Sequence, residues 1–166
     1  VAHIENAIAV GAGHIKLQGS GEGNLLKGNA GNNQLNGLGG NDGLDGGAGH
    51  DVVVGGSGRD VLVGGAGSDT FKFGSINDST LALKDVIIDF NLTRGKDKID
   101  LSAIDANTTQ AGNQAFSFIG NTNFTAAGQV RFAGGVVSGD VNGDKVADFA
   151  IELKNVTKLL TSDFIL

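Results

Sequence analysis

The chain has 166 residues, 29 of them glycine, and a formal net charge of −6 at pH 7. It contains no cysteine, proline, methionine, tryptophan or tyrosine, which excludes disulfides and thiolate metal sites. The negative charge argues against nucleic acid as a partner, and no apolar run is long enough for a membrane-spanning helix.

Residues 1–72 divide into eight consecutive units of nine residues, and the eighth position of each unit, beginning with Ile8 and Leu17, is apolar. Units 46–54, 55–63 and 64–72 share two glycines, a small residue, a third glycine, a variable residue and an aspartate. The sixth positions along the run are Asn6, Ile15, Asn24, Asn33, Asp42, Asp51, Asp60 and Asp69. A strict period of nine indicates one structural unit repeated along the chain.

Each unit predicts a turn followed by a short strand. Glycine at the first positions favours a turn, because glycine adopts positive φ without a steric clash. The last three positions predict a strand whose eighth residue points inward. Two units then form one coil, and coils stack at about 4.8 Å, the spacing of paired strands. This pattern predicts an all-β fold that begins with a parallel β-roll of nonapeptide repeats over residues 1–78.

Turns two units apart lie on the same edge of the roll. Asp78 lies nine residues after Asp69, so its phase extends the edge that carries Asp60. Ca²⁺ takes six or more oxygen ligands at about 2.3–2.6 Å, which two stacked turns can supply from carboxylates and backbone carbonyls. The strong sites predicted are Asp42 with Asp60, Asp51 with Asp69, and Asp60 with Asp78. The weaker ones are Asn24 with Asp42 and Asn33 with Asp51, and the Ile15–Asn33 pair is expected to be empty. The alternative is that these aspartates only cap their own turns.

The motif G-G-x-G-x-D-x-U-x is the calcium-binding nonapeptide of RTX proteins, and residues 1–78 resemble the parallel β-roll of that family. The resemblance implies that positions 2, 4 and 6 of a lower turn and positions 1, 3 and 6 of the upper turn bind the ion. The turn residues implicated in this way, beside the sixth positions, are Gly31, Gly40, Gly46, Gly47, Gly49, Gly55, Gly56, Ser57, Gly58, Gly64, Ala66 and Ser75. The expected content is about three to five Ca²⁺ ions.

After Asp78 the period of nine stops, and short apolar runs separated by turn signals predict mostly antiparallel strands. The runs are 85–90, 98–101, 115–119, 129–133 and 147–153. Residues 79–166 are therefore expected to form a small β-sandwich-like C-terminal cap that covers the last coil.

A loop in this second half contains Asp140, Asn142, Asp144 and Asp148, with oxygens spaced as in an EF-hand-like calcium loop. Lys145 stands where such a loop has glycine, and no glutamate closes it. These four residues are weaker metal candidates, and a polar hairpin turn is the alternative.

Residues 69–73, 85–90, 95–102 and 163–166 resemble the C-terminal domain of serralysin-type secreted metalloproteases. No His-Glu-x-x-His zinc motif is present, so we expect a non-catalytic module. The resemblance implies a larger secreted bacterial protein, most simply a zinc metalloprotease, whose calcium-dependent folding takes place outside the cell. It also implies that residues 163–166 are a type I secretion signal, an ordinary edge strand being the alternative.

The expected partners are therefore calcium, an upstream catalytic or adhesive domain of the same polypeptide, and the type I secretion apparatus. Two other functions remain open. One is a calcium-dependent polyuronate (alginate)-binding module of an epimerase, with an acidic polysaccharide as partner. The other is the rigid C-terminal module of a secreted adhesin.

Overall fold

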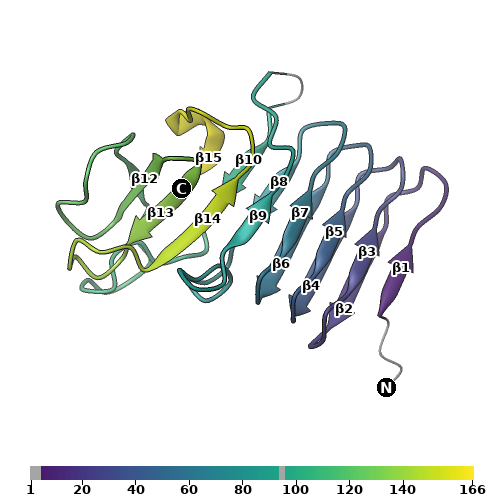
Figure 1. The fold of residues 1–166 in the computed structure, drawn as a ribbon, viewed down its shortest axis with the longest axis horizontal. Helices are drawn as coiled ribbons and strands as arrows, with labels where there is room; N and C mark the ends of the chain where they lie inside the picture. Colours follow the sequence, from purple (N-terminus) through teal and green to yellow (C-terminus); the bar gives the residue numbers. More distant parts are fainter. Residues whose placement is uncertain (1–4, 94–95) are drawn as a thin grey trace.

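Two sheets of stacked, mainly parallel strands organise the computed structural model, which describes residues 5–93 and 96–166 (Figure 1). Residues 1–4, with the start of the first predicted unit, and residues 94–95 lie outside this description. Within the described ranges, turns and loops join the strands, and the single helical element is the 3₁₀ turn η1 (Thr161–Asp163). No helix in those ranges is long and apolar enough to cross a membrane.

The first sheet has nine strands in the order β1-β3-β5-β7-β9-β14-β13-β12-β11. Its strands are β1 (Asn6–Ile8), β3 (Leu25–Lys27), β5 (Gly43–Asp45), β7 (Val61–Val63), β9 (Asp85–Ile87), β11 (Ser117–Phe118), β12 (Gln129–Ala133), β13 (Val136–Asp140) and β14 (Phe149–Leu153). Pairing is parallel from β1 to β14 and again between β11 and β12, whereas β14, β13 and β12 pair antiparallel. The expectation of mostly antiparallel strands after Asp78 therefore holds only for β12 to β14.

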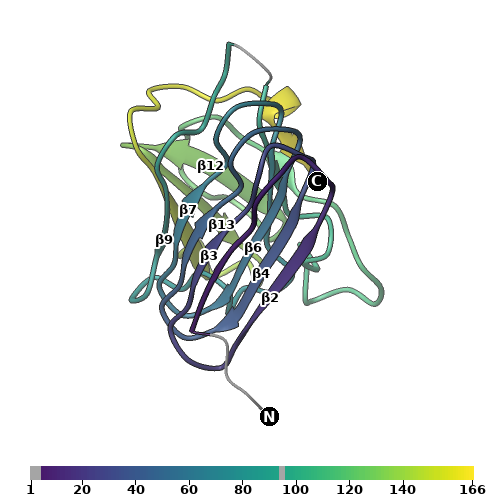
Figure 2. The same cartoon turned by 90° about the vertical axis from the view of Figure 1, so that its right-hand side faces the viewer.

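The second sheet is parallel throughout, in the order β15-β10-β8-β6-β4-β2. Its strands are β2 (Lys16–Ser20), β4 (Gln34–Gly39), β6 (Val52–Ser57), β8 (Thr70–Lys72), β10 (Lys98–Asp100) and β15 (Phe164–Ile165). The two sheets face each other as the layers of a flattened coil (Figure 2). The predicted parallel β-roll of nonapeptide repeats is confirmed.

The eighth positions of the repeats form the thin interior of the roll. Leu26, Leu44 and Leu62 are stacked in the first sheet, as are Leu35, Val53 and Phe71 in the second, and all six are at most 1% exposed. Burial of such a side chain contributes about 1.5–3 kcal/mol relative to full exposure. One inward residue per nine therefore supplies the apolar core, as the spacing predicted.

The first unit departs from the predicted phase. Ala7, rather than Ile8, pairs with Leu26, and Ile8 is 68% exposed. The pairing offset is 19 residues here instead of 18, because the turn between β1 and β2 is one residue longer than in the later units. The prediction that Ile8 points inward is thus wrong.

Both sheets continue across residues 78 and 79, the predicted boundary between roll and cap. Strand β9 extends the first sheet and joins it to β14, while β10 and the C-terminal β15 extend the second. Phe116 packs edge-on against Phe149 with 5.7 Å between the ring centroids, and the ring centroids of Phe118 and Phe164 are 4.9 Å apart. The cap therefore closes the roll by sharing its sheets and adding aromatic packing beyond the last coil.

The burial pattern makes the effect of truncation at one strand predictable. Leu62→Ala should lower the free energy of unfolding by about 2–5 kcal/mol, because it leaves a cavity between the sheets. Val61→Ala, on the outer face and 45% exposed, should lower it by less than about 1 kcal/mol. Urea unfolding at saturating calcium checks both variants, and equal losses would contradict the assignment of faces.

Candidate functional site

The turns of neighbouring coils touch each other, and glycine permits this contact. Gly58 and Gly67 have φ values of 140° and 151°. A Cβ atom added to Gly58 would lie 1.7 Å from the Gly40 carbonyl oxygen, and one on Gly67 would lie 1.6 Å from that of Gly49. Any larger residue would force the coils apart, so these glycines set the distance between stacked turns.

Along one edge, each sixth-position side chain accepts a hydrogen bond from the coil before it. Oδ1 of Asp42 accepts from the Asn24 N–H at 2.7 Å, Oδ1 of Asp60 from Asp42 at 2.8 Å, and Oδ1 of Asp85 from Asp60 at 2.9 Å. These four residues are at most 5% exposed. One carboxylate oxygen of each aspartate is thus used to hold neighbouring turns in register.

The opposite edge repeats the arrangement. Oδ1 of Asp51 accepts from the Asn33 N–H at 2.7 Å, Oδ1 of Asp69 from Asp51 at 2.8 Å, and Oδ1 of Asp97 from Asp69 at 3.0 Å. The fifth positions bond in the reverse direction: Asn32 N–H donates to His14 Nδ1, and Ser68 N–H donates to His50 Nδ1. The two imidazoles therefore connect coils as hydrogen-bond acceptors.

Five of the stacked aspartates have a second carboxylate oxygen that is buried and has no hydrogen-bond partner. These atoms are Oδ2 of Asp42, Asp51, Asp60, Asp69 and Asp85. Burial of an ionised oxygen without a partner is strongly unfavourable unless a cation or a proton compensates its charge. Two rows of such oxygens, one on each edge, are the main electrostatic feature of the roll.

Backbone carbonyls converge on the same unpaired oxygens. A Cβ built on Gly46 would lie 2.5 Å from Asp51 Oδ2 and 2.6 Å from the Gly64 carbonyl oxygen of the next coil. A Cβ on Gly37 would lie 2.1 Å from Asp42 Oδ2 and 2.5 Å from the Gly55 carbonyl oxygen. Glycine thus keeps open a space surrounded by carboxylate and carbonyl oxygens, the donor set that Ca²⁺ prefers. The residues present therefore fit the ion that the repeat pattern predicts.

Burial also changes the protonation of these carboxylates. It raises the pKa of Asp60 and Asp69 to about 6 and that of Asp85 to about 8, with neighbouring carboxylates adding to the shift. Burial raises the pKa of Asp42 and Asp51 as well. Protons and a bound cation would therefore compete for the same oxygens.

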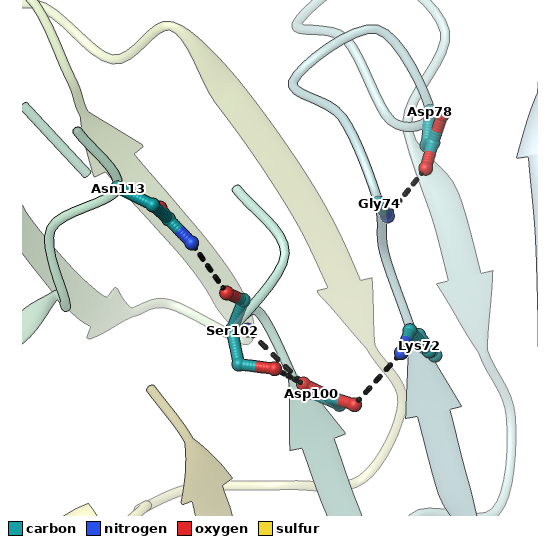
Figure 3. A network of polar contacts seen from close by, with 6 residues as sticks. All are labelled: Lys72, Gly74, Asp78, Asp100, Ser102 and Asn113. Atoms are coloured by element: carbon teal, nitrogen blue, oxygen red, sulfur yellow. Dashed lines mark hydrogen bonds and ion pairs between the residues drawn. The ribbon is translucent and has the colours of Figure 1, made fainter. Parts of the chain in front are cut away.

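Asp85, not Asp78, occupies the position above Asp60, which corrects the prediction from nine-residue phase. The Asp78 carboxylate accepts a hydrogen bond from the N–H group of Gly74 at 2.7 Å (Figure 3). It accepts another from the N–H group of Ser75 at 3.0 Å. Its negative charge still raises the pKa of Asp60 and Asp85. Asp78 therefore lies beside this end of the edge, and its binding to metal stays a prediction.

Sequence reasoning missed Asp85 and Asp97 because insertions interrupt the repeat. Asp85 follows Asp60 by 25 residues, and Asp97 follows Asp69 by 28, instead of 18. The signal available was the start of each apolar run, since Asp85 begins β9 and Asp97 immediately precedes β10. Asp97 differs from the other stacked aspartates because its Oδ2 accepts from the Asn91 N–H at 2.8 Å.

The two asparagine levels of the edges differ from the aspartate levels. Nδ2 of Asn33 donates to the carbonyl oxygens of Gly31 at 2.6 Å and Gly46 at 3.1 Å, both predicted calcium ligands. Oδ1 of Asn24 accepts from the Ser20 N–H at 2.6 Å. Amide hydrogen bonds thus occupy oxygens that the weak sites would need, and calcium at these two levels stays a prediction.

The remaining predicted carbonyl ligands lie in the stacked turns, where some also join coils. The Gly47 oxygen accepts from Ala66 N–H at 2.9 Å, and the Ala66 oxygen accepts from Gly49 N–H at 2.8 Å. A carbonyl oxygen retains a second lone pair in this arrangement. The carbonyls of Gly40, Gly55, Gly56, Ser57, Gly58, Gly64 and Ser75 stay predicted ligands.

The loop with Asp140, Asn142, Asp144 and Asp148 satisfies its own acidic groups. Oδ1 of Asp140 accepts from Gly143 N–H at 2.6 Å and Oδ2 from Lys145 N–H at 3.0 Å. Oδ2 of Asp148 accepts from Val141 N–H at 2.7 Å. In the described residues, no three Asp, Glu, His or Cys side chains gather as a metal cluster. These hydrogen bonds suit a polar turn, and metal binding by the four residues stays a prediction.

Comparisons with known proteins agree with this geometry. A family model described as the peptidase M10 serralysin C terminal matches residues 24–166. Metalloprotease AprA of Pseudomonas entomophila strain L48 is 42% identical in an alignment 94 residues long, which covers 49% of this chain and 17% of that protein. The chain thus spans less than a fifth of that relative's length. The solution structure of the AlgE6R3 subunit of the Azotobacter vinelandii mannuronan C5-epimerase has a TM-score of 0.54 and 26% identity, covering 99% of this chain and 84% of that one.

Substitution on the two edges should have unequal effects on calcium binding. Asp60→Ala removes a carboxylate that stands between Asp42 and Asp85 on its edge, so it should weaken two sites and reduce the ions bound by about two. Asn33→Ala removes the Nδ2 hydrogen bonds and the buried Oδ1, which has no hydrogen-bond partner and is a predicted ligand of one weak site only, so it should reduce the ions bound by one at most. Equilibrium dialysis measures the bound ions, and equal losses in the two variants would contradict the edge assignment.

The metal-free protein should become more stable as the pH falls. The folded pKa values of about 6 for Asp60 and Asp69 and about 8 for Asp85 exceed the unfolded value of 3.8. Protonation of these three carboxyl groups therefore makes its full contribution to the free energy of unfolding below about pH 4, and that contribution is lost as the pH rises through 6 to 8. Saturating calcium should reverse the slope over this range. Urea unfolding from pH 5 to 8, with and without calcium, tests both slopes, and parallel slopes would contradict the assignment.

Proposed function

Because the chain belongs to the peptidase M10 serralysin C-terminal family, we propose that it is a non-catalytic module that folds on binding calcium and supports the export of a larger protein. Its fold is a calcium-binding β-roll of the RTX type. One observation carries the proposal: five buried carboxylate oxygens without a partner lie in two rows, facing spaces that glycine keeps open.

The aspartate edges resist folding when no cation is bound. Asp42, Asp60 and Asp85 follow one another on one edge, and their like charges disfavour the ionised, folded state. Calcium supplies the positive charge that these oxygens lack, so its binding free energy becomes folding free energy. Extracellular calcium modules bind with dissociation constants of about 10⁻⁴–10⁻³ M. The chain is therefore expected to stay loosely folded inside the cell and to fold outside it.

The C-terminal segment 163–166 serves two successive roles in this proposal. Before folding it is the type I secretion signal, read by the export apparatus as an extended chain. After folding, β15 pairs with β10, and Phe164 is buried against Phe118. This docking supports the second role, since the segment closes the second sheet only once the roll exists.

The larger protein is proposed to be a secreted zinc metalloprotease, with its catalytic domain upstream of this module in the same polypeptide. The match to Metalloprotease AprA and the family model support this assignment. No three potential zinc-binding side chains cluster among the described residues, and the sequence has no His-Glu-x-x-His motif. Proteolysis is accordingly assigned to the upstream domain, and about three to five calcium ions to this one.

A second candidate is a calcium-dependent polyuronate-binding module, because the chain is similar in structure to a subunit of a mannuronan epimerase. The outer face of the second sheet carries Lys16, Gln34, Val52 and Thr70 along one register and Lys72 at the end of β8, with no carboxylate within β2, β4, β6 or β8. This face suits an acidic polysaccharide, though it holds few lysines. Retention of the calcium-loaded chain on immobilised alginate would favour this function over a purely folding role, and indifference to alginate would exclude it.

Calcium titration of the chelated protein is the direct test. Far-UV circular dichroism should show a cooperative gain of β structure near millimolar calcium, with about three or more ions bound at saturation. Cooperativity is expected because Asp42, Asp60 and Asp85 are linked by hydrogen bonds. Magnesium, which requires tighter octahedral geometry, serves as the control cation. A chain that is fully folded without calcium and binds none would contradict the proposal.

A further inference from the structure

Asp89, in the segment that follows β9, is hydrogen-bonded to the turn at residues 64–69, which lies on the edge that carries Asp51 and Asp69. Its Oδ1 accepts a hydrogen bond from the Gly64 N–H at 3.0 Å, and its Oδ2 accepts from the Gly65 N–H at 2.8 Å. The two donors are consecutive, so one carboxylate holds two adjoining peptide groups. Asp89 is not part of the nine-residue pattern, and no site prediction includes it.

In the coils that precede this level, a backbone carbonyl oxygen accepts the hydrogen bond from the glycine that corresponds to Gly64. Gly28 N–H donates to the Asp45 carbonyl oxygen at 2.7 Å, and Gly46 N–H donates to that of Val63 at 2.9 Å. Each acceptor lies in the strand of the next coil. For Gly64 the equivalent acceptor would be Ile88, because Leu62 pairs with Ile87. The Asp89 side chain supplies the acceptor instead, at the level where regular coiling ends.

The peptide held by Asp89 also presents a predicted calcium ligand. A trans peptide is planar, and its C=O and N–H point in opposite directions. The N–H of Gly65 and the carbonyl of Gly64 belong to one such peptide. The N–H faces Asp89. The Gly64 carbonyl oxygen faces the space that Gly46 leaves open: a Cβ atom added to Gly46 would lie 2.6 Å from this oxygen and 2.5 Å from Asp51 Oδ2. A hydrogen bond on one side of the peptide therefore sets the direction of the carbonyl on the other.

We propose that Asp89 is a positioning residue for the calcium site at Asp51: it fixes the Gly64–Gly65 peptide so that the Gly64 carbonyl faces the ion. This inference rests on the proposed function, in which the aspartate edges bind calcium. Asp89 itself acts through the peptide, because both of its oxygens already accept hydrogen bonds. Its charge also increases the negative potential around Asp69, so a test must separate charge from geometry.

The test compares calcium binding of the whole chain by calorimetry and equilibrium dialysis in six variants. The single variants are Asp89→Asn, Asp89→Glu, Asp51→Asn and Asp42→Asn, and the double variants combine Asp89→Asn with Asp51→Asn or with Asp42→Asn. Asp89→Asn should weaken the binding of one ion about tenfold or more, since a hydrogen bond to a charged group is lost. Asp89→Glu keeps the charge but displaces the carboxylate, so it should also weaken that ion. Asp105→Asn, a change in the cap, is the matched control and should leave binding unchanged.

The double variants decide between a local role and a general one. Asp89→Asn should add nothing to Asp51→Asn, because both act on one site, but should add fully to Asp42→Asn on the other edge. Additivity with Asp51→Asn, or full affinity in Asp89→Glu, would overturn the positioning role. If Asp89→Asn does not fold at saturating calcium, Asp89→Glu alone decides the question. Absence of calcium binding in the unaltered chain would instead overturn the proposed function.

Discussion

The carboxylate at the sixth position of each turn is the interaction on which the rest of the structure depends. One of its oxygens accepts the N–H of the preceding coil at 2.7–3.0 Å, which aligns the turns. The other oxygen, in Asp42, Asp51, Asp60, Asp69 and Asp85, is buried without a partner. The same side chain therefore holds the register of the coils and creates the charge that opposes their stacking. A module built this way is stable only when a cation or protons compensate that charge.

The thin apolar interior explains why this compensation matters. The roll buries only one large side chain per nine residues, such as Leu44, Val53 and Leu62. Folding must also order a chain in which 29 of 166 residues are glycine, and glycine loses more conformational entropy than any other residue. The cap adds a larger aromatic core, in which Phe116 contacts Phe149. Strands β9 and β10 pair with the last roll strands on one side and with β14 and β15 of the cap on the other, so the two parts share continuous sheets.

The last coil shows how a repeat can end without exposing its backbone. Where the next coil should supply a carbonyl acceptor for Gly64, Asp89 supplies carboxylate oxygens to Gly64 and Gly65, and Asp97 continues the row of carboxylates above Asp69. Side chains at the junction thus imitate a further coil, while β14 and β15 cover the unpaired strand edges of β9 and β10. Unpaired edges invite association with other chains, so this closure also limits aggregation.

The sequence by itself determined the β-roll, its inward residues from Leu26 to Phe71 and the two edges up to Asp60 and Asp69, because glycine, aspartate and leucine recur at a fixed period and each has one physical role. It also indicated most cap strands, although β13 was not foreseen, and β9, β10 and β11 pair parallel where mostly antiparallel strands were expected. Only the tertiary structure decided that Ala7 replaces Ile8 inside, that Asp85 replaces Asp78 above Asp60, and that Asp97 and Asp89 complete the other edge. Once insertions break the period, position along the chain no longer specifies position in space, and pairing between strands does.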